Sequence, residues 1–295
     1  MTDSTRPSGL RARLSSGKIV LAPGVFDPLT ASIASDAGFE ALYLSGAAIA
    51  YTRLGRPDIG LVTMSEVADT LSHVRERVET PIIVDADTGY GNALNVERTV
   101  RVFERAGASA IQIEDQSLPK RCGHLADKTL IPAREMVGKI KAALDARVSD
   151  ETLIVARTDA VAVEGLAAAV DRAGLYAQAG ADVLFVEGPQ DSAQLARVGG
   201  IGEGRVPLMA NMVEGGRTPV LSANALEALG FSLVICPGGI VRALARAARD
   251  FYGTLARDGD SSAFRDRMFD FDGLNNLLGT SDILARGKRY EGGRR

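Results

Sequence analysis

Several carboxylates follow short apolar runs of the sequence, in positions where they could hold a metal ion. Asp85 and Asp87 follow one such run, and Glu114 and Glu187 follow two others. Negative charges gathered in one pocket repel one another unless a cation lies among them. Because the ligands are oxygens and no histidine is near, the pattern favours Mg²⁺, or alternatively Mn²⁺, over zinc. A second interpretation is that Asp85 and Glu114 cap the following helices, and for Glu187 alone the choice is open.

Arg157 is a basic residue at the end of another apolar run, within the segment ARTDA. A guanidinium fork binds a carboxylate through two parallel hydrogen bonds, which suits a substrate with several carboxylates. A salt bridge to neighbouring carboxylates is the alternative interpretation, and both can hold at once. Arg157 is therefore a candidate for substrate binding and for catalysis.

The polar segment 116–132 is long enough to close over a site as a lid. It places Cys122 within the basic sequence KRCGH. Nearby cations lower the pKa of a thiol from its usual value of about 8.5, so that the sulfur can act as an acid or a base. We therefore predict Cys122 to be catalytic, with Lys120 and His124 beside it.

The elements that must position these residues form a repeating pattern. A phrase in which a glycine leads into an apolar run recurs at Gly38, Gly107, Gly180 and Gly230. Each glycine fits the position just after a helix, where a left-handed backbone conformation costs glycine little. Four other β-rich runs lie at 18–22, 81–84, 152–156 and 206–210. Together the two sets predict eight strands that alternate with helices.

Eight strand and helix units predict an α/β fold of the (β/α)₈ TIM-barrel type, in which the chemistry lies on the loops after the strands. An open, doubly wound sheet is the alternative. The count of eight and the lack of a Gly-x-Gly-x-x-Gly turn after the first strand favour the barrel.

Further helices are predicted beyond the last strand, at 241–257 and 262–278. The first can complete the outer ring of the barrel, and the second is surplus and could pack on a neighbouring subunit. We expect a single barrel domain over residues 1–295, with 241–295 as a helical extension of the same domain.

Composition and charge limit the partners of the protein. Its 295 residues are 46% hydrophobic and 24% charged, with a formal net charge of −3, so it lacks the basic surface that nucleic-acid binding requires. No apolar run approaches the roughly 20 residues that cross a bilayer, and residues 1–18 do not resemble a signal peptide. We expect a cytoplasmic protein without nucleic-acid or membrane partners. Cys236 ends an apolar run and is expected to pack in the core.

Eight phrases of the sequence resemble the isocitrate lyase and phosphoenolpyruvate mutase superfamily. They are YLSG (43–46), GRPDIG (55–60), DADTGYGNA (85–93), IEDQ (113–116), PKRCGH (119–124), ARTDA (156–160), FVEG (185–188) and NMVEGGRTP (211–219). They occur in order over most of the chain, so the resemblance is specific. It implies a barrel enzyme that acts on a small carboxylic acid. It also implies a homotetramer in which a C-terminal helix swaps between neighbours, which would account for the surplus helix.

The resemblance also implies roles for single residues. Asp85 is expected to hold Mg²⁺, with Asp87 and Glu114 holding it directly or through water. Cys122 is expected on a gating loop, from which it protonates the leaving enolate. Asp58 is expected to organise the surroundings of the metal. The residues expected to contact the substrate are Tyr43, Ser45, Gly46, Asp58, Gly123, Arg157, Glu187 and Asn211.

The implied reaction is the cleavage of a carbon–carbon bond in a small 2-hydroxy dicarboxylate or tricarboxylate, of the 2-methylisocitrate or 2,3-dimethylmalate type. A 2-oxo acid and a carboxylic acid would be released. The main alternative is a phosphonomutase, because some carboxyphosphonoenolpyruvate mutases have a similar Lys-Arg-Cys-Gly-His loop. A catalytically silent barrel scaffold is a third hypothesis. The segments 45–47 and 236–239 differ from the pattern common in the lyases, and no hydroxyl residue directly follows Pro237.

Overall fold

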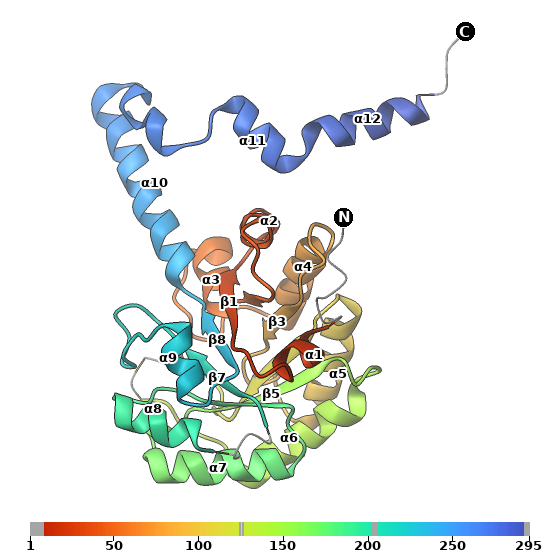
Figure 1. Ribbon diagram of the computed structural model, residues 1–295, viewed down its shortest axis with the longest axis vertical. Coiled ribbons are helices and arrows are strands. Elements are labelled where there is room, and N and C mark those ends of the chain that lie inside the picture. Colours follow the sequence, from red (N-terminus) through yellow and green to blue (C-terminus); the bar gives the residue numbers. More distant parts are fainter. Residues whose placement is uncertain (1–8, 124, 126, 202–205, 292–295) are drawn as a thin grey trace. The chain divides into compact units, whose positions relative to one another are not determined.

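The structure is a computed structural model that describes residues 9–123, 125, 127–201 and 206–291. Its centre is a closed barrel of eight parallel strands, in which each strand pairs with the next and β8 pairs with β1 (Figure 1). The predicted (β/α)₈ barrel is confirmed, and the open sheet is wrong. The strands are β1 Val20–Val25, β2 Leu42–Leu44, β3 Ile82–Asp85, β4 Ala110–Glu114, β5 Leu153–Thr158, β6 Val183–Val186, β7 Leu208–Asn211 and β8 Leu233–Cys236.

The helices of this part lie before β1 and in the connections between strands. They are α1 Leu10–Leu14, α2 Pro28–Asp36, α3 Gly46–Ile49, α4 Met64–Arg75, α5 Ala93–Arg105, α6 Ala133–Ala146, α7 Leu166–Gln178, α8 Ser192–Gly199 and α9 Ala223–Ala228. A π-helical turn, η1 (Ala50–Leu54), and a 3₁₀ turn, η2 (Ala160–Ala162), complete this part. The glycines predicted to follow helices do follow α2, α5, α7 and α9, with φ angles of 87°, 98°, 99° and 95°.

Side chains along each strand alternate between two apolar clusters. Ile82 of β3 belongs to the cluster that includes helix side chains such as Val67 of α4. Ile83, the next residue, belongs to the cluster that fills the barrel. Leu10 and Leu14 of α1 belong to this inner cluster too. Because the pleat of a strand sends successive side chains to opposite faces, the inner cluster identifies which positions point into the barrel.

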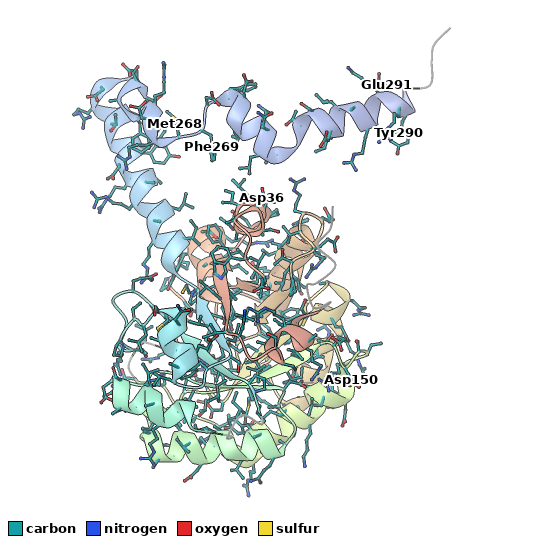
Figure 2. All side chains as sticks on the ribbon, in the orientation of Figure 1. Asp36, Asp150, Met268, Phe269, Tyr290 and Glu291 are labelled. Atoms are coloured by element: carbon teal, nitrogen blue, oxygen red, sulfur yellow. The ribbon has the colours of Figure 1, made fainter. Side chains whose placement is uncertain are left out.

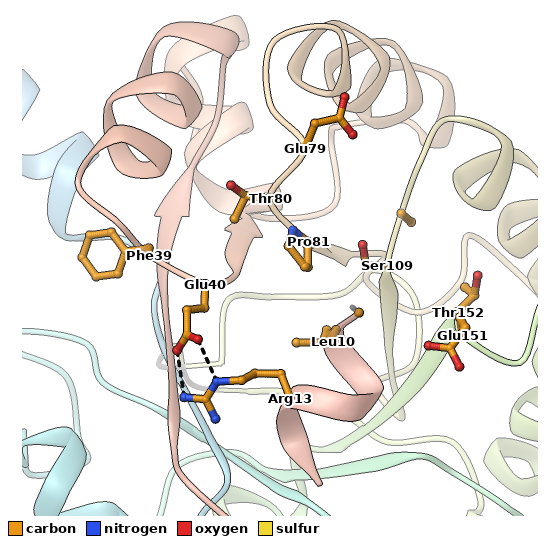
Figure 3. A pocket seen from close by; sticks show the side chains of 12 residues that line it. Leu10, Arg13, Phe39, Glu40, Glu79, Thr80, Pro81, Ser109, Glu151 and Thr152 are labelled. Atoms are coloured by element: carbon orange, nitrogen blue, oxygen red, sulfur yellow. Dashed lines mark hydrogen bonds and ion pairs between the residues drawn. The ribbon is translucent and has the colours of Figure 1, made fainter. Parts of the chain in front are cut away.

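The helix α1 lies at the base of the barrel, where the strands begin. A cavity of about 440 Å³ lies there between α1 and residues that directly precede β3, β4 and β5 (Figure 3). Arg13 of α1 contacts Glu40 in the lining of this cavity (Figure 3). With its base covered by α1, the barrel leaves the carboxyl ends of the strands for a site.

The first strand extends further than the sequence predicts. The apolar run 18–22 predicts a strand that ends before Pro23 and Gly24, yet β1 continues through both to Val25. Gly24 is required by a close approach, because a Cβ atom there would lie 2.2 Å from the backbone oxygen of Pro237. The Pro-Gly pair therefore lets β1 pass close to the end of β8 and does not mark a turn.

The chain divides into two compact units, Met1–Val241 and Arg242–Arg295. The elements from the end of the barrel onward are α10 Gly239–Asp258, η3 Ser262–Arg267, α11 Phe271–Leu278 and α12 Thr280–Tyr290. None of the described helices combines the length and the apolar character that crossing a bilayer requires.

The prediction of one helix over 262–278 is wrong. The short 3₁₀ helix η3 ends at Arg267, and the next residue, Met268, has an extended backbone with φ −139° and ψ 157°. The carboxylate of Asp270 then accepts a hydrogen bond from the Gly273 backbone at 2.7 Å and begins a new helix, α11. Figure 2 shows Met268 and Phe269 in the stretch before α11, and Tyr290 at the end of α12.

Candidate active site

Polar side chains occupy the last inward position of most strands. Ile83 points into the barrel, so Asp85, two residues further on, points inward as well. The same alternation places Arg157 two residues after Val155. The inward polar residues at or just beyond the strand ends are Ser45, Asp85, Glu114, Arg157, Glu187 and Asn211. They converge on the mouth of the barrel from different strands.

These carboxylates do not cap the helices that follow them. The backbone at the start of α5 is capped by Asn92. The helix α6 begins after Pro132 without a side-chain cap, and Asp191 caps α8. The capping interpretation of Asp85 and Glu114 is therefore wrong, and their burial needs another explanation.

Asp85 and Asp87 lie together beside Gly46. A Cβ atom on Gly46 would lie 3.3 Å from Oδ2 of Asp85 and 3.8 Å from Oδ1 of Asp87. Burial raises the pKa of Asp87 to about 7, Lys120 opposes the rise, and Asp85 adds to it. The absence of a side chain at Gly46 keeps space open in front of both carboxylates.

Lys120 carries positive charge into this group of carboxylates. Its Nζ lies 2.6 Å from Oδ1 of Asp87 and also pairs with Asp58. Burial lowers the pKa of Lys120, but Asp87 and Asp58 outweigh it and raise the value well above that of an ordinary lysine. Lys120 is therefore held as an ammonium ion, so it acts as a cation and not as a base.

Asp85 is also oriented from inside the barrel. Nε2 of Gln112 donates to Oδ1 of Asp85 at 3.4 Å, and the Tyr43 hydroxyl donates to Oε1 of Gln112 at 3.1 Å. All three side chains are buried. The predicted substrate residue Tyr43 thus contacts Gln112, a residue that no sequence motif singled out.

Arg157 is surrounded by acidic side chains. Its Nε lies 3.2 Å from Oε2 of Glu114 and 2.8 Å from Oδ2 of Asp159. Nη2 donates to the other oxygen of Asp159 at 3.0 Å and lies 4.0 Å from Oε2 of Glu187. The guanidinium also lies 5.2 Å from the centre of the Phe185 ring. The salt-bridge interpretation of Arg157 is confirmed, and it does not exclude a role in binding substrate.

Two other predicted residues already have partners in the protein. Nδ2 of Asn211 donates to Oε2 of Glu187 at 3.0 Å. Oγ of Ser45 accepts a hydrogen bond from the Ala48 backbone at 3.2 Å, so it caps the short helix α3. A hydroxyl that accepts one bond keeps its hydrogen for donation, so Ser45 can still donate to a substrate carboxylate.

Two buried oxygens of the site are available to bind a cation. Oε1 of Glu114 and Oδ1 of Asn211 are buried and have no hydrogen-bond partner among the residues that the structure describes, although buried polar atoms are usually paired. Burial raises the pKa of Glu114 well above its ordinary value, and Arg157 opposes this rise. Within the described ranges, no three His, Cys, Asp or Glu side chains are grouped closely enough to hold an ion directly. The oxygen donors therefore fit a hard cation that keeps part of its water shell.

The loop with Cys122 covers this mouth. A Cβ atom on Gly123 would lie 2.5 Å from Nη2 of Arg157 and 2.9 Å from Cγ of Glu187, so the loop backbone packs directly on both. The backbone nitrogen of Cys122 donates to the carbonyl oxygen of Asp58 at 3.2 Å. The thiol itself is half-buried. His124, the other predicted catalytic residue of this loop, lies outside the described residues.

The second cysteine lies outside this group. Cys236 is half-buried and packs against the core, and burial raises the pKa of its thiol. Gln112 and Lys128 are neighbours of the site that were not predicted from the sequence. A polar residue in the middle of an apolar strand was a signal for Gln112, whereas nothing local distinguishes Lys128 from a solvated loop lysine.

Sequence similarity to known proteins extends over almost the whole chain. A family model described as phosphoenolpyruvate phosphomutase matches residues 10–255. The 2,3-dimethylmalate lyase of Eubacterium barkeri is 41% identical over 285 residues, covering 97% of this chain and 98% of that protein. The 2-methylisocitrate lyase of Aeropyrum pernix is 46% identical over 280 residues, covering 94% and 88%. The chloroplastic carboxyvinyl-carboxyphosphonate phosphorylmutase of Arabidopsis thaliana is 41% identical over 276 residues, covering 92% and 81%.

Solved structures that are similar to this chain also belong to enzymes. A crystal structure of 2,3-dimethylmalate lyase has a TM-score of 0.90 and 34% identity, covering 96% of this chain and 94% of that one. Phosphonopyruvate hydrolase in complex with oxalate and Mg²⁺ has a TM-score of 0.86 and 32% identity, covering 95% and 97%. The chain belongs to the phosphoenolpyruvate mutase and isocitrate lyase superfamily. Within that superfamily, its similarity to the lyases makes it an enzyme of the carbon–carbon lyase class.

Proposed function

We propose that the enzyme cleaves the C2–C3 bond of a small 2-hydroxy dicarboxylate or tricarboxylate of the 2-methylisocitrate or 2,3-dimethylmalate type. The observation that carries this proposal is the Cys122 loop, which lies over a mouth containing both a buried arginine and buried acidic oxygens. The names of the relatives with 41% and 46% identity support the same substrate class.

We propose that Mg²⁺, or alternatively Mn²⁺, binds at Asp85, with Asp87 and Glu114 contacting it through water. The two unpaired buried oxygens and the raised pKa of Asp87 support a cation here. The complex of phosphonopyruvate hydrolase with oxalate and Mg²⁺ supports the same class of ion. Such an ion would polarise the 2-hydroxyl and the neighbouring carboxylate of the substrate.

The protein supplies the remaining steps. Arg157, with Ser45, Gly46 and Asn211, binds the substrate carboxylates, and Tyr43, Gly123 and Glu187 complete the pocket. Glu114 is our candidate for the base that accepts the proton of the 2-hydroxyl, because it lies at the mouth with a buried oxygen that has no hydrogen-bond partner among the described residues. The bond electrons pass to the leaving carbon, and the Cys122 thiol returns a proton to it. Lys120 contributes positive charge, and His124 is a further catalytic candidate.

We also propose a homotetramer in which the C-terminal extension packs on a neighbouring subunit. Among the described residues of α11 and α12 no side chain is buried, and Phe271 and Tyr290 are both 83% exposed. Exposed apolar side chains of this kind favour contact with a second copy. On this proposal residues 1–295 form one barrel domain with an extension over 241–295. The charge and composition support a cytoplasmic enzyme.

A substrate panel tests the reaction. The wild-type enzyme with Mg²⁺ is expected to release pyruvate or glyoxylate from at least one 2-hydroxy diacid or triacid, and chelation by EDTA is expected to abolish this release. The Cys122→Ser variant should lose about 10²–10⁴-fold in kcat, the contribution typical of a positioned acid. Cys236→Ser is the matched control and should keep its activity.

The same panel separates the phosphonomutase hypothesis, which the Arabidopsis relative favours. Phosphorus NMR of phosphoenolpyruvate-like and carboxyphosphonate substrates detects any carbon–phosphorus rearrangement. Rearrangement without release of a 2-oxo acid would overturn the lyase assignment. Lyase activity that is unchanged in Cys122→Ser would overturn the proton donor.

A further inference from the structure

Lys128 is a buried lysine in a surface loop. Its side chain is 2% exposed, although lysine is among the residues least often buried. Its ammonium group donates to the carbonyl oxygen of Gly123 at 2.5 Å and to Oδ1 of Asp159 at 2.7 Å. One contact is within the loop and the other is with the barrel, so Lys128 connects the two.

Asp159 is shared between this lysine and the arginine of the site. It is fully buried, and its two oxygens accept from Nη2 and Nε of Arg157 at 3.0 and 2.8 Å. Burial alone would raise the pKa of Asp159, but Arg157 and Lys128 hold it down to about 2. The carboxylate is therefore charged throughout the neutral range, and it holds both cations in fixed positions.

The carbonyl that Lys128 binds belongs to the residue in contact with the site. Gly123 leaves no room for a side chain against Arg157 and Glu187, and Cys122 is the residue before it. Holding the Gly123 carbonyl therefore fixes the backbone next to the proposed proton donor. A displacement of about 1 Å at such a position can cost about 10²-fold in rate.

We propose that Lys128 is a positioning residue that fastens the 116–132 loop over the mouth and, through Asp159, fixes the orientation of Arg157. It touches neither the proposed metal ligands nor the reacting atoms. The proposal rests on the proposed lyase function only where turnover is measured. Loop closure itself can be measured without any substrate.

The test compares Lys128→Met with the matched control Asp127→Asn. Asp127 is the preceding residue and forms an exposed ion pair with Arg121 at 3.4 Å, so its substitution removes a charge from the same loop without touching Asp159. Lys128→Met should lower kcat/KM by about 10²-fold. Asp127→Asn should stay within about twofold of wild type.

Hydrogen–deuterium exchange of the ligand-free protein provides the second readout. In Lys128→Met, peptides from 117–130 should exchange at least about 10-fold faster, while those from α5 and α7 keep the wild-type rate. The combined effect of Asp159→Asn and Lys128→Met on loop exchange should be smaller than the sum of the two single effects, because both changes remove the Lys128–Asp159 ion pair.

Unchanged loop exchange in Lys128→Met, or faster exchange throughout the barrel, would overturn the positioning role. If the wild type cleaves no 2-hydroxy acid, the proposed function fails while the exchange result still decides the role of Lys128.

Discussion

The two ends of the barrel use charged residues in different ways. At the base, Glu40 pairs with Arg13 at 2.8 Å with its side chain 38% exposed, and Asp182 binds Arg11 and Arg147 at 2.8 and 2.7 Å. At the mouth, several charged side chains are buried close together, and some of their oxygens have no hydrogen-bond partner in the described part of the chain.

The contrast indicates what each end is for. Paired charges at the base connect α1 to the residues between the strands, and each of these carboxylates lies against an arginine. Burying carboxylates close together destabilises a fold, so such a group is expected where a ligand is to be bound. The cavity described at the base is thus not our candidate for the chemical site, since Arg13 in its lining is already paired with Glu40.

Glu114→Gln is the substitution with the largest expected effect on this contrast. It should lower kcat by about 10²–10⁴-fold because a candidate base is lost. In metal-free protein it should raise the free energy of unfolding by about 0.5–2 kcal/mol, because it removes a carboxylate whose pKa is raised by burial. Arg157 keeps its ion pair with Asp159 in this variant. Urea unfolding in EDTA measures the second effect. A lower stability together with full activity would contradict the contrast between the ends.

Arg157→Lys should lower kcat/KM by about 10²–10³-fold, because an ammonium cannot form the two parallel bonds to Asp159 that hold the positive charge at the mouth. Steady-state kinetics with the best substrate of the panel measures this loss. Arg147→Lys at the base is the matched control, and its kinetics should equal those of wild type. An equal loss of kcat/KM in both variants would show that the arginines at the two ends do not have different roles.

Glu40→Gln should have the smallest effect. It removes one half-exposed ion pair at the base, so the free energy of unfolding should fall by about 0.2–1 kcal/mol. The kinetic constants should not change. Its sign on stability is opposite to that expected for Glu114→Gln, so urea unfolding of the two variants side by side sharpens the comparison. A higher free energy of unfolding in Glu40→Gln than in wild type would contradict the difference between the two ends.

The barrel could be predicted from the sequence because its signals are local. Apolar runs after helix-ending glycines mark strands, and a closed barrel sends the residues after those strands to one end. Asp85 and Arg157 were identified in this way, and the alternation of side chains then points both inward. The resemblance to a known superfamily added roles that the patterns themselves could not supply.

The parts that could not be predicted depend on contacts between distant segments. Lys128 and Asp159 lie 31 residues apart, and the close approach of Gly24 to Pro237 links the two ends of the barrel sequence. The break before α11 depends on the Asp270 cap, which interrupts an otherwise helical pattern. Propensity and periodicity describe neighbours in sequence and do not detect such pairs.

The loop over the mouth leaves the barrel and returns to it at one place. Gln116 and Leu130 form an antiparallel bridge, and the Ser117 backbone donates to Thr129 at 2.8 Å. Because these contacts hold the two ends of the loop together, the segment between them can differ in sequence while its ends stay in place. We expect that its counterpart from another member of the superfamily can replace it between these two points without a change in the strands, provided that the partners of Lys120 and Lys128 are kept.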